Sequence, residues 1–425
     1  MRSIHWAAIG LLLASFVLLL GVAPATEAGP SPTPAPPSPG RPHVTPPPPS
    51  SIARRPLLTR PLRRTDTCQT ITALRRQQAL ARGIKHTLCT RPVAPAHHPV
   101  RPAPRTAPAQ FSGPDTGCVE GVTVFNRFYQ CTQQTTGIIA IDNQSGATVG
   151  EVDVDFAFWT TLANNLRSWD EDVYLTVTNE WGIIAGNTSL GTPMQCNDAT
   201  ANDCFLTSTD YPLAFQQALM DPIGTNWSGT VSWISQDPGI TFQTIGLTFF
   251  WSTTAPDVSP NTVAYELDSL ERQRCDNTLA NFKQGGCVNP DSLNYYILSL
   301  SDPSVQAVAQ HIYNAEYGTS ASPPLPDQFG VPGANNPLTR DTNATDIDAN
   351  RQASCNNFVP NGPGDSCDEF PFASTYQGAA FVGPGRFSTE HVPSDQNSQA
   401  GSELIGFYLS QRIIDGDPFY ALIVS

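Results

Sequence analysis

The sequence has 425 residues, 40% of them hydrophobic, so the chain is long enough for more than one domain and can bury a large core. Its formal net charge is −14, which argues against a nucleic-acid-binding surface spread over the whole protein. The charge is unevenly divided. Residues 29–110 hold 13 Lys/Arg, one acidic residue and 19 of the 40 prolines, whereas residues 111–425 hold 9 Lys/Arg and 35 acidic residues.

The first 28 residues are typical of a secretory signal peptide. Arg2 gives a positive start, residues 7–23 form a mostly apolar run, and Ala23, Ala25 and Ala28 offer cleavage sites. The alternative, an uncleaved membrane anchor, is less favoured because the apolar run is slightly short for a full membrane span. We therefore expect a secreted, extracellular protein with no transmembrane segment after signal cleavage.

Residues 29–110 form a basic arm rich in proline and arginine. Such a segment lacks the apolar residues needed to offset chain entropy, so we expect it to be largely disordered. Residues 69–85 could fold into one short amphipathic helix, although a solvated basic linker is the favoured interpretation. Tethering to a cell wall, a membrane or nucleic acid would each suit the charge of the arm.

Ten cysteines fall into five sequential couples with short gaps. An even number of cysteines in an exported chain favours disulfide bonds, and the lack of a CxxC motif makes a metal site a weak alternative. Spacing alone does not fix the connectivity. We predict local pairing, which gives Cys68–Cys89, Cys118–Cys131, Cys196–Cys204, Cys275–Cys287 and Cys355–Cys367.

Residues 111–260 have the pattern of an all-β, sandwich-like domain. Stretches rich in Val, Ile, Thr, Phe and Tyr are separated by turns rich in Asn, Gly and Asp, and one helix is expected at residues 211–220. Six tryptophans in this region could line a glycan-binding face, but at this spacing most are expected in the core. The predicted strands are 122–129, 137–141, 149–159, 173–179, 230–234 and 240–251.

Residues 261–425 differ in character. An apolar helical pattern covers residues 304–317, and the segment after it is rich in Pro, Gly and Asn, which indicates a loop across a surface. Patterns of regular secondary structure then resume. The predicted elements are strands at 371–376 and 387–392, a helix that starts at Ser402, and a final strand at 419–424.

The best local signal for chemistry is the run Cys367-Asp368-Glu369-Phe370-Pro371. Two adjacent carboxylates enter a predicted strand directly after a predicted disulfide. Adjacent strand residues point to opposite faces, so only one carboxylate can face a given site. The alternative is a turn-capping Asp368 beside a solvated Glu369, and spacing alone favours that alternative.

A second signal is the polar stretch 394–404. Ser402 suits a helix N-cap and Glu403 the first helical turn, which explains Glu403 without any function. The functional alternative is a hard-cation ligand, since carboxylate and amide oxygens suit Mg²⁺, Mn²⁺ or Ca²⁺. Only His311 and His391 occur in the acidic part of the chain, so a histidine-rich metal site is not expected, and His311 lies in an apolar helical pattern typical of a core residue.

Two motifs in the C-terminal part occur in an order known from one family. The first is Asp368-Glu369-Phe370-Pro371-Phe372-Ala373, and the second is Pro393-Ser394-Asp395 with the loop from Asn397 to Gly401. Together they resemble the NucA/NucB-type deoxyribonuclease family, most tightly over residues 365–424. The resemblance implies a small nuclease-like domain at residues 261–425 with a ββα-metal core of two strands, a loop and a metal-bearing helix. The expected fold class is therefore α+β, with a disordered Pro/Arg-rich arm, a sandwich-like domain and this nuclease-like domain.

The resemblance also implies roles for individual residues. Asp368 would be the general base that takes a proton from water, Glu369 would orient the site, and Asn397 would position the base or the metal. Glu403, together with Asn397, is the predicted ligand of a divalent cation, with Mg²⁺ or Mn²⁺ preferred over Ca²⁺. The expected substrate contacts come from Arg386, Arg412 and Gln396.

The sequence thus predicts a secreted metal-dependent endonuclease that hydrolyses phosphodiester bonds in DNA. The acidic charge of residues 261–425 opposes a polyanionic substrate, and a divalent cation and the basic arm would offset it. A different class remains open: a non-catalytic secreted protein whose residues 111–260 bind a glycan or a cell surface. A third reading is a toxin-like effector, whose mark would be a dedicated inhibitor protein.

Overall fold

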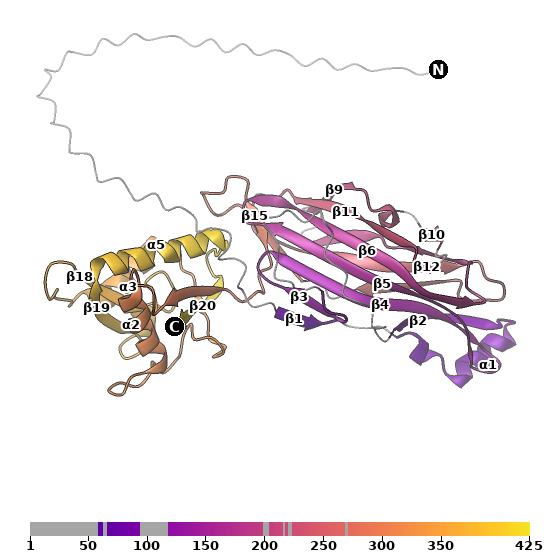
Figure 1. The fold of residues 1–425 in the computed structure, drawn as a ribbon, viewed down its shortest axis with the longest axis horizontal. Helices are drawn as coiled ribbons and strands as arrows, with labels where there is room; N and C mark the ends of the chain where they lie inside the picture. Colours follow the sequence, from indigo (N-terminus) through magenta and orange to yellow (C-terminus); the bar gives the residue numbers. More distant parts are fainter. Residues whose placement is uncertain are drawn as a thin grey trace, which may run out of the picture. The chain divides into compact units, whose positions relative to one another are not determined.

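The computed structural model describes residues 58–62, 66–93, 118–198, 204–215, 217–219, 223–267 and 271–425. The predicted signal peptide and much of the predicted arm lie outside these residues. Strands form most of the described elements, and the helices are few, so the fold is mostly β within the predicted α+β class (Figure 1). No described helix is long and apolar enough to cross a membrane.

The first sheet is built around three long antiparallel strands, β4 (Tyr129–Asp142), β5 (Thr148–Ala163) and β6 (Leu166–Gly182). Along β5, Val154, Phe156 and Phe158 recur at every second position and are fully buried, as a strand with one core-facing side requires. The eight-stranded order is β1-β3-β4-β5-β6-β11-β9 with β2 also on β4. The remaining strands are β1 (Leu58–Pro61), β2 (His86–Pro92), β3 (Val122–Phe125), β9 (Cys204–Thr209) and β11 (Asn226–Ser235).

The second sheet is centred on β12 (Thr241–Thr253). Its order is β10-β7-β12-β14-β15, and β8 and β13 also pair with β12. The two sheets share one hydrophobic core, in which the rings of Phe156 and Phe249 meet with centroids 5.0 Å apart, so together they form a sandwich. The remaining strands are β7 (Thr188–Gly191), β8 (Met194–Asp198), β10 (Ala218–Leu219), β13 (Thr262–Leu267), β14 (Gln273–Asp276) and β15 (Gly286–Val288).

The two sheets take in more of the chain than residues 111–260. β1 and β2 come from the predicted arm and pair with β3 and β4, and the short helix α1 (Ala73–Ala81) precedes β2. β13, β14 and β15 lie beyond residue 260 but belong to the second sheet. The expectation of disorder is therefore wrong for residues 58–62 and 66–93, because backbone pairing with the sheet orders them.

The helix predicted at residues 211–220 is wrong over the residues that the structure describes there. A 3-10 turn, Pro212–Ala214, and the short strand β10 occupy this stretch. The tryptophans agree with a core role: Trp169, Trp233 and Trp251 are at most 3% exposed, whereas Trp181 is 41% exposed.

The C-terminal part contains a three-stranded sheet, a hairpin and four helices within residues 289–425. Its own core includes Leu298, Ile312, Phe407 and Phe419. The elements in chain order are β16 (Tyr295–Ser299), α2 (Gln306–Tyr317), β17 (Leu338–Thr339), α3 (Ala344–Cys355), β18 (Asp365–Phe370), α4 (Ala379–Val382), β19 (Ser388–Pro393), α5 (Ser394–Ser410) and β20 (Pro418–Val424).

Three predictions for this part differ from the structure. The strand predicted at 371–376 lies earlier, because β18 ends at Phe370 and Pro371 lacks the N–H group that would continue the ladder. The predicted loop contains α3, whose N-cap Asn343 accepts a hydrogen bond from the backbone of Thr345. Helix α5 starts at Ser394 rather than Ser402, so the predicted N-cap position lies inside the helix.

The five predicted disulfide bonds are all present, and every cysteine of the chain is paired. Four of them lie in the sandwich and its N-terminal extension. The fifth, Cys355–Cys367, links the end of α3 to β18. It therefore holds the strand that carries Asp368.

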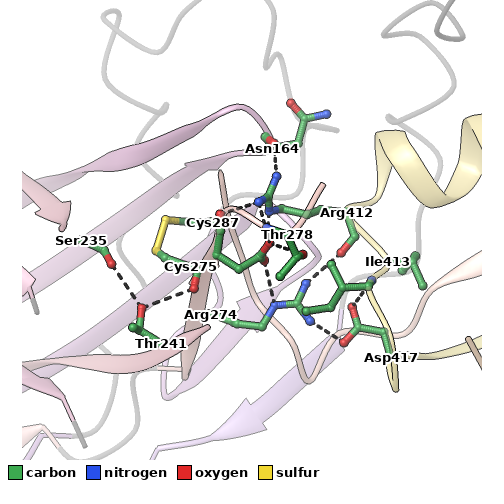
Figure 2. Close-up of polar contacts among 12 residues, drawn as sticks. Asn164, Ser235, Thr241, Arg274, Cys275, Thr278, Cys287, Arg412, Ile413 and Asp417 are labelled. Carbon is green, nitrogen blue, oxygen red and sulfur yellow. Dashed lines mark hydrogen bonds and ion pairs between the residues drawn. A yellow bond between two sulfur atoms is a disulfide. The ribbon is translucent and has the colours of Figure 1, made fainter. Parts of the chain in front are cut away.

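Buried charges connect the sandwich to the C-terminal part (Figure 2). Arg412, which follows α5, donates to the Asp276 carboxylate from Nε (3.0 Å) and Nη2 (2.6 Å). Arg274 contacts Asp417, and Asp417 also accepts from Arg127 at 2.8 Å. All five of these residues are at most 8% exposed, so the contacts between the two parts exclude water.

Candidate active site

A hairpin followed directly by a helix forms the frame of the candidate site. β18 and β19 pair antiparallel, with Asp368 opposite Glu390, and α5 begins immediately after β19. Phe370 and Val392 point from the hairpin into the core. Because side chains alternate along a strand, Asp368 shares the face of Phe370, and Glu369 lies on the other face. This arrangement has the ββα order that the resemblance implies.

Asp368 is held from an element far away in the sequence. Its Oδ2 lies 2.7 Å from Nδ1 of His311 on α2, and Nε2 of the same ring lies 2.9 Å from Oγ of Ser388 on β19. His311 is 1% exposed and Asp368 is 6% exposed. With Asp368 ionised, Nδ1 of His311 is the donor of this hydrogen bond, because a carboxylate can only accept.

Sequence reasoning placed His311 in the core and gave it no role at the site. The ring is indeed buried, but both of its nitrogens have polar partners. The apolar helical pattern around His311 predicted the burial correctly. It carried no information about Asp368, which is 57 residues away in the sequence.

Glu369 lies on the opposite face of β18, close to α3. Burial raises the pKa of Glu369 to about 7, the negative charge of Asp368 adds to this effect, and the backbone N–H of Ala373 opposes it. A carboxyl group with a pKa near neutrality can both bind and release protons at physiological pH. The alternation of β18 keeps this group away from the face that Asp368 shares with Phe370.

Asn397 connects the first turns of α5 to β18. Its Nδ2 donates to Oγ of Ser366 and to the backbone oxygen of Cys367, both at 2.9 Å. Because both partners accept from the amide nitrogen, the amide oxygen is left for another ligand. Gln396 has a different place: its side-chain oxygen accepts from the backbone N–H of Ala307 at 2.7 Å, which ties α5 to the start of α2.

Glu403 lies six residues after Asn397 on the same helix. This spacing corresponds to about 9 Å along the helix axis and about 120° around it, so the two side chains leave the helix in different directions. Glu403 accepts from Gln399 at 2.9 Å. It also acts on the buried phenol of Tyr296, whose pKa is raised well above its usual range by burial and then by the charges of Glu403, Tyr408 and Asp368.

The two predicted arginine contacts differ in accessibility. The side chain of Arg386 is 47% exposed and pairs with Asp327 through Nε. Arg412 is fully buried, and Asp276 and the backbone of Asn164 occupy its guanidinium group. The prediction that Arg412 contacts substrate is therefore wrong, because the side chain is buried and its guanidinium group is bound by protein partners.

The donor set at the site consists of oxygen atoms. Among the residues that the structure describes, no group of three or more His, Cys, Asp or Glu side chains is placed to hold a metal ion. The carboxylate of Glu403 and the amide oxygen of Asn397, the two predicted ligands, are donor types that suit a hard cation. Mg²⁺ is commonly bound through one or two carboxylates while keeping several waters, so such an ion does not need to be enclosed by protein ligands.

Comparison with known proteins gives a family match in the C-terminal part of the chain. Residues 330–422 match the model of the family described as Deoxyribonuclease NucA/NucB. The matched segment contains the hairpin, Asp368, Asn397 and the whole of α5. No curated protein matches the chain. The match supports a nuclease function for the C-terminal part.

Proposed function

We propose that this C-terminal part, which matches the deoxyribonuclease family, is a metal-dependent endonuclease that hydrolyses phosphodiester bonds in DNA, with Asp368 as the general base. The observation that carries the proposal is the fixed place of Asp368. Its carboxylate lies on a hairpin that a disulfide ties to α3, that Asn397 ties to α5, and against which His311 packs. Such rigidity favours catalysis, because a base must be within hydrogen-bond reach of the proton that it removes.

Asp368 has one oxygen committed and one available. Oδ2 is bonded to His311, and Oδ1 has no hydrogen-bond partner among the described residues. We assign the proton transfer to Oδ1: a water molecule gives its proton to Asp368 while its oxygen forms a bond to phosphorus. The bond from phosphorus to the departing sugar oxygen breaks, and that oxygen takes a proton from solvent.

A divalent cation would supply Lewis-acid stabilisation of the charge on the phosphate and the departing oxygen. Asn397, through its amide oxygen, and Glu403 are the residues we assign to hold it. Because these two residues leave the helix in different directions, we expect one of them to act through a water molecule. Mg²⁺ and Mn²⁺ suit this oxygen-rich set, and Ca²⁺ is the third choice.

The charge of the C-terminal part has to be offset for DNA to approach. Residues 262–425 hold 7 Lys/Arg and 19 acidic residues. We assign the compensation to the bound cation, to the exposed Arg386 and to the basic residues of the N-terminal segment. DNA binding should therefore weaken as salt rises, because phosphate contacts release counterions.

Secretion is part of the proposal. Five disulfide bonds in one chain favour an oxidising compartment, and the N-terminal sequence has the features of a signal peptide. The non-catalytic alternative, a glycan-binding sandwich, has less support. Trp169, Trp233 and Trp251 are in the core, and the exposed Trp181 donates its indole N–H to Glu151.

The test of the proposal is cleavage of supercoiled plasmid DNA by the purified mature protein. We expect nicked and linear products with Mg²⁺ or Mn²⁺ and none after the protein has been treated with EDTA. Readdition of the cation should restore cutting. Absence of cutting with every cation would overturn the nuclease assignment, and full cutting in EDTA would overturn its metal dependence alone.

A further inference from the structure

Three elements meet at a buried chain of hydrogen bonds beside the hairpin. Asp368 lies on β18, Ser388 on β19 and His311 on α2. The imidazole ring of His311 lies within hydrogen-bond distance of both other side chains and so links the two strands. The distances are 2.7 Å from Asp368 Oδ2 to Nδ1 and 2.9 Å from Nε2 to Ser388 Oγ.

Packing alone does not require an imidazole at this position. The neighbours of His311 on the buried face of α2, Val308 and Ile312, are 2% exposed or less. A leucine of similar volume would continue this apolar face without desolvation of any polar atom. The ring is satisfied only because both nitrogens reach partners on the hairpin, so its place depends on Asp368 and Ser388.

The geometry also explains why both partners are needed. Asp368 pairs across the hairpin with Glu390, and Ser388 pairs with Phe370, so Asp368 and Ser388 are diagonal neighbours on the same face. A ring that bonds both cannot rotate without breaking one bond. The hydrogen bond to Oδ2 therefore restricts rotation of the Asp368 carboxylate about its Cβ–Cγ bond, and this determines where Oδ1 points.

We propose that His311 is a positioning residue: with Ser388 fixing its ring, it holds Asp368 so that Oδ1 meets the attacking water. This inference rests on the proposed function of Asp368. His311 does not touch substrate. It acts in the way that a second group orients a catalytic base in hydrolytic enzymes.

Two amide variants separate positioning from mere space filling. The amide nitrogen of His311→Asn can take the place of Nδ1 and still donate to Asp368, whereas the amide of His311→Gln extends toward the place of Nε2. Because asparagine has no counterpart of Nε2 to bond Ser388, we expect His311→Asn to lose part of the kcat for plasmid cleavage, about as much as removal of the Ser388 hydroxyl does. His311→Gln should lose about 10- to 100-fold in kcat with KM unchanged, the usual size of an effect on a group that orients another.

Ser388 offers a matched pair on the other side of the ring. Ser388→Thr keeps the hydroxyl that bonds Nε2, and Ser388→Ala removes it. We expect Ser388→Thr to cleave at the wild-type rate and Ser388→Ala to lose kcat. The positioning role would be overturned if the two amide variants cleaved at equal rates, or if the two Ser388 variants did. It would also be overturned if the variants raised KM and left kcat unchanged.

A measurement that does not depend on cleavage keeps this inference apart from the proposed function. In ¹⁵N-labelled protein, the His311 signals should show a proton on Nδ1 in a strong hydrogen bond, and the His311→Gln variant identifies these signals. Asp368→Asn should weaken that bond and shift the Nδ1 proton signal. A proton only on Nε2, or no change in Asp368→Asn, contradicts the inference, whereas absent cleavage with the expected signals contradicts only the nuclease assignment.

Discussion

The sharpest prediction on stability concerns Arg412, the buried arginine between the sandwich and the C-terminal part. The substitution Arg412→Met keeps much of the apolar length of the side chain and removes its charge. Asp276, which is 0% exposed, then loses both hydrogen bonds from that guanidinium to its carboxylate. It keeps Arg274, whose Nε lies 3.3 Å away, and the hydrogen bonds that the hydroxyl and the backbone N–H of Thr278 donate to Oδ1.

The size of the effect follows from burial. Removal of one partner of a buried ion pair typically costs 3–5 kcal/mol, because the remaining charge stays desolvated. The residual contacts of Asp276 with Arg274 and Thr278 place Arg412→Met near the lower end, at about 3 kcal/mol. Burial also lowers the pKa of the nearby Arg127 to about 10, which shows how strongly this region disfavours unpaired charge. The isosteric partner variant Asp276→Asn removes the negative charge that Arg412→Met leaves behind.

Equilibrium urea unfolding followed by tryptophan fluorescence measures the effect. The control is Arg351→Met, which removes an exposed pair with Asp348 and should change the free energy of unfolding by about 1 kcal/mol or less. The double variant Arg412→Met/Asp276→Asn should be more stable than the sum of the single effects predicts. A loss below about 1 kcal/mol for Arg412→Met, or strict additivity, would refute the reasoning about the buried cluster.

Two further predictions concern buried groups of the C-terminal part. Glu316 is 1% exposed, neither of its carboxyl oxygens has a partner among the described residues, and burial raises its pKa to about 8. Since the folded protein binds this proton more tightly than the unfolded chain, stability should fall as pH rises from about 4.5 to 8, by up to about 1.4 kcal/mol per pH unit from this group. In thermal melts, the melting temperature of Glu316→Gln should rise relative to that of the wild type as pH rises. A difference between the two melting temperatures that does not change with pH would argue against Glu316 as the source of the effect. Replacement of Cys355 and Cys367 by alanine should lower the free energy of unfolding by about 3 kcal/mol, because the disulfide closes a loop with a sequence separation of 12. An unchanged midpoint of urea unfolding would show that the packing of α3 and β18 does not need the bond.

The sequence predicted those elements whose pattern is local. The strands predicted at 137–141 and 149–159 lie within β4 and β5, and the strand predicted at 240–251 and the helix predicted at 304–317 overlap β12 and α2. Their alternating or helical apolar patterns are read from neighbouring residues alone. The five disulfides were also predicted, because each joins cysteines at most 21 residues apart.

Elements that depend on distant partners were missed. The segment of β2 is basic and lies between prolines, so its composition indicated disorder, yet its backbone pairs with β4 over seven residues. The polar character of residues 394–401 predicts a loop, whereas the structure has the start of α5 there. Those residues are helical because their side chains bond other elements, as Gln396 and Asn397 do, rather than packing an apolar stripe.

The same limit applies to the site. Sequence motifs located Asp368 and Asn397, which the structure brings to neighbouring positions on β18 and α5. They gave no sign of Ser388 or of the contact with His311, because no spacing rule connects α2 to the hairpin. Arg412 was predicted to contact substrate, and only the fold shows that it pairs with Asp276 in a buried cluster.

The most direct test of the central claim compares initial rates of plasmid nicking for the wild type and for Asp368→Asn in the same Mg²⁺ or Mn²⁺ buffer. Asp348→Asn, an exposed change on α3 within the matched segment, is the control. Loss of a general base typically lowers the rate about 10²- to 10⁴-fold, so Asp368→Asn should fall by that amount while Asp348→Asn cuts at the wild-type rate. Undiminished cutting by a folded Asp368→Asn protein would contradict the assignment of Asp368 as the base.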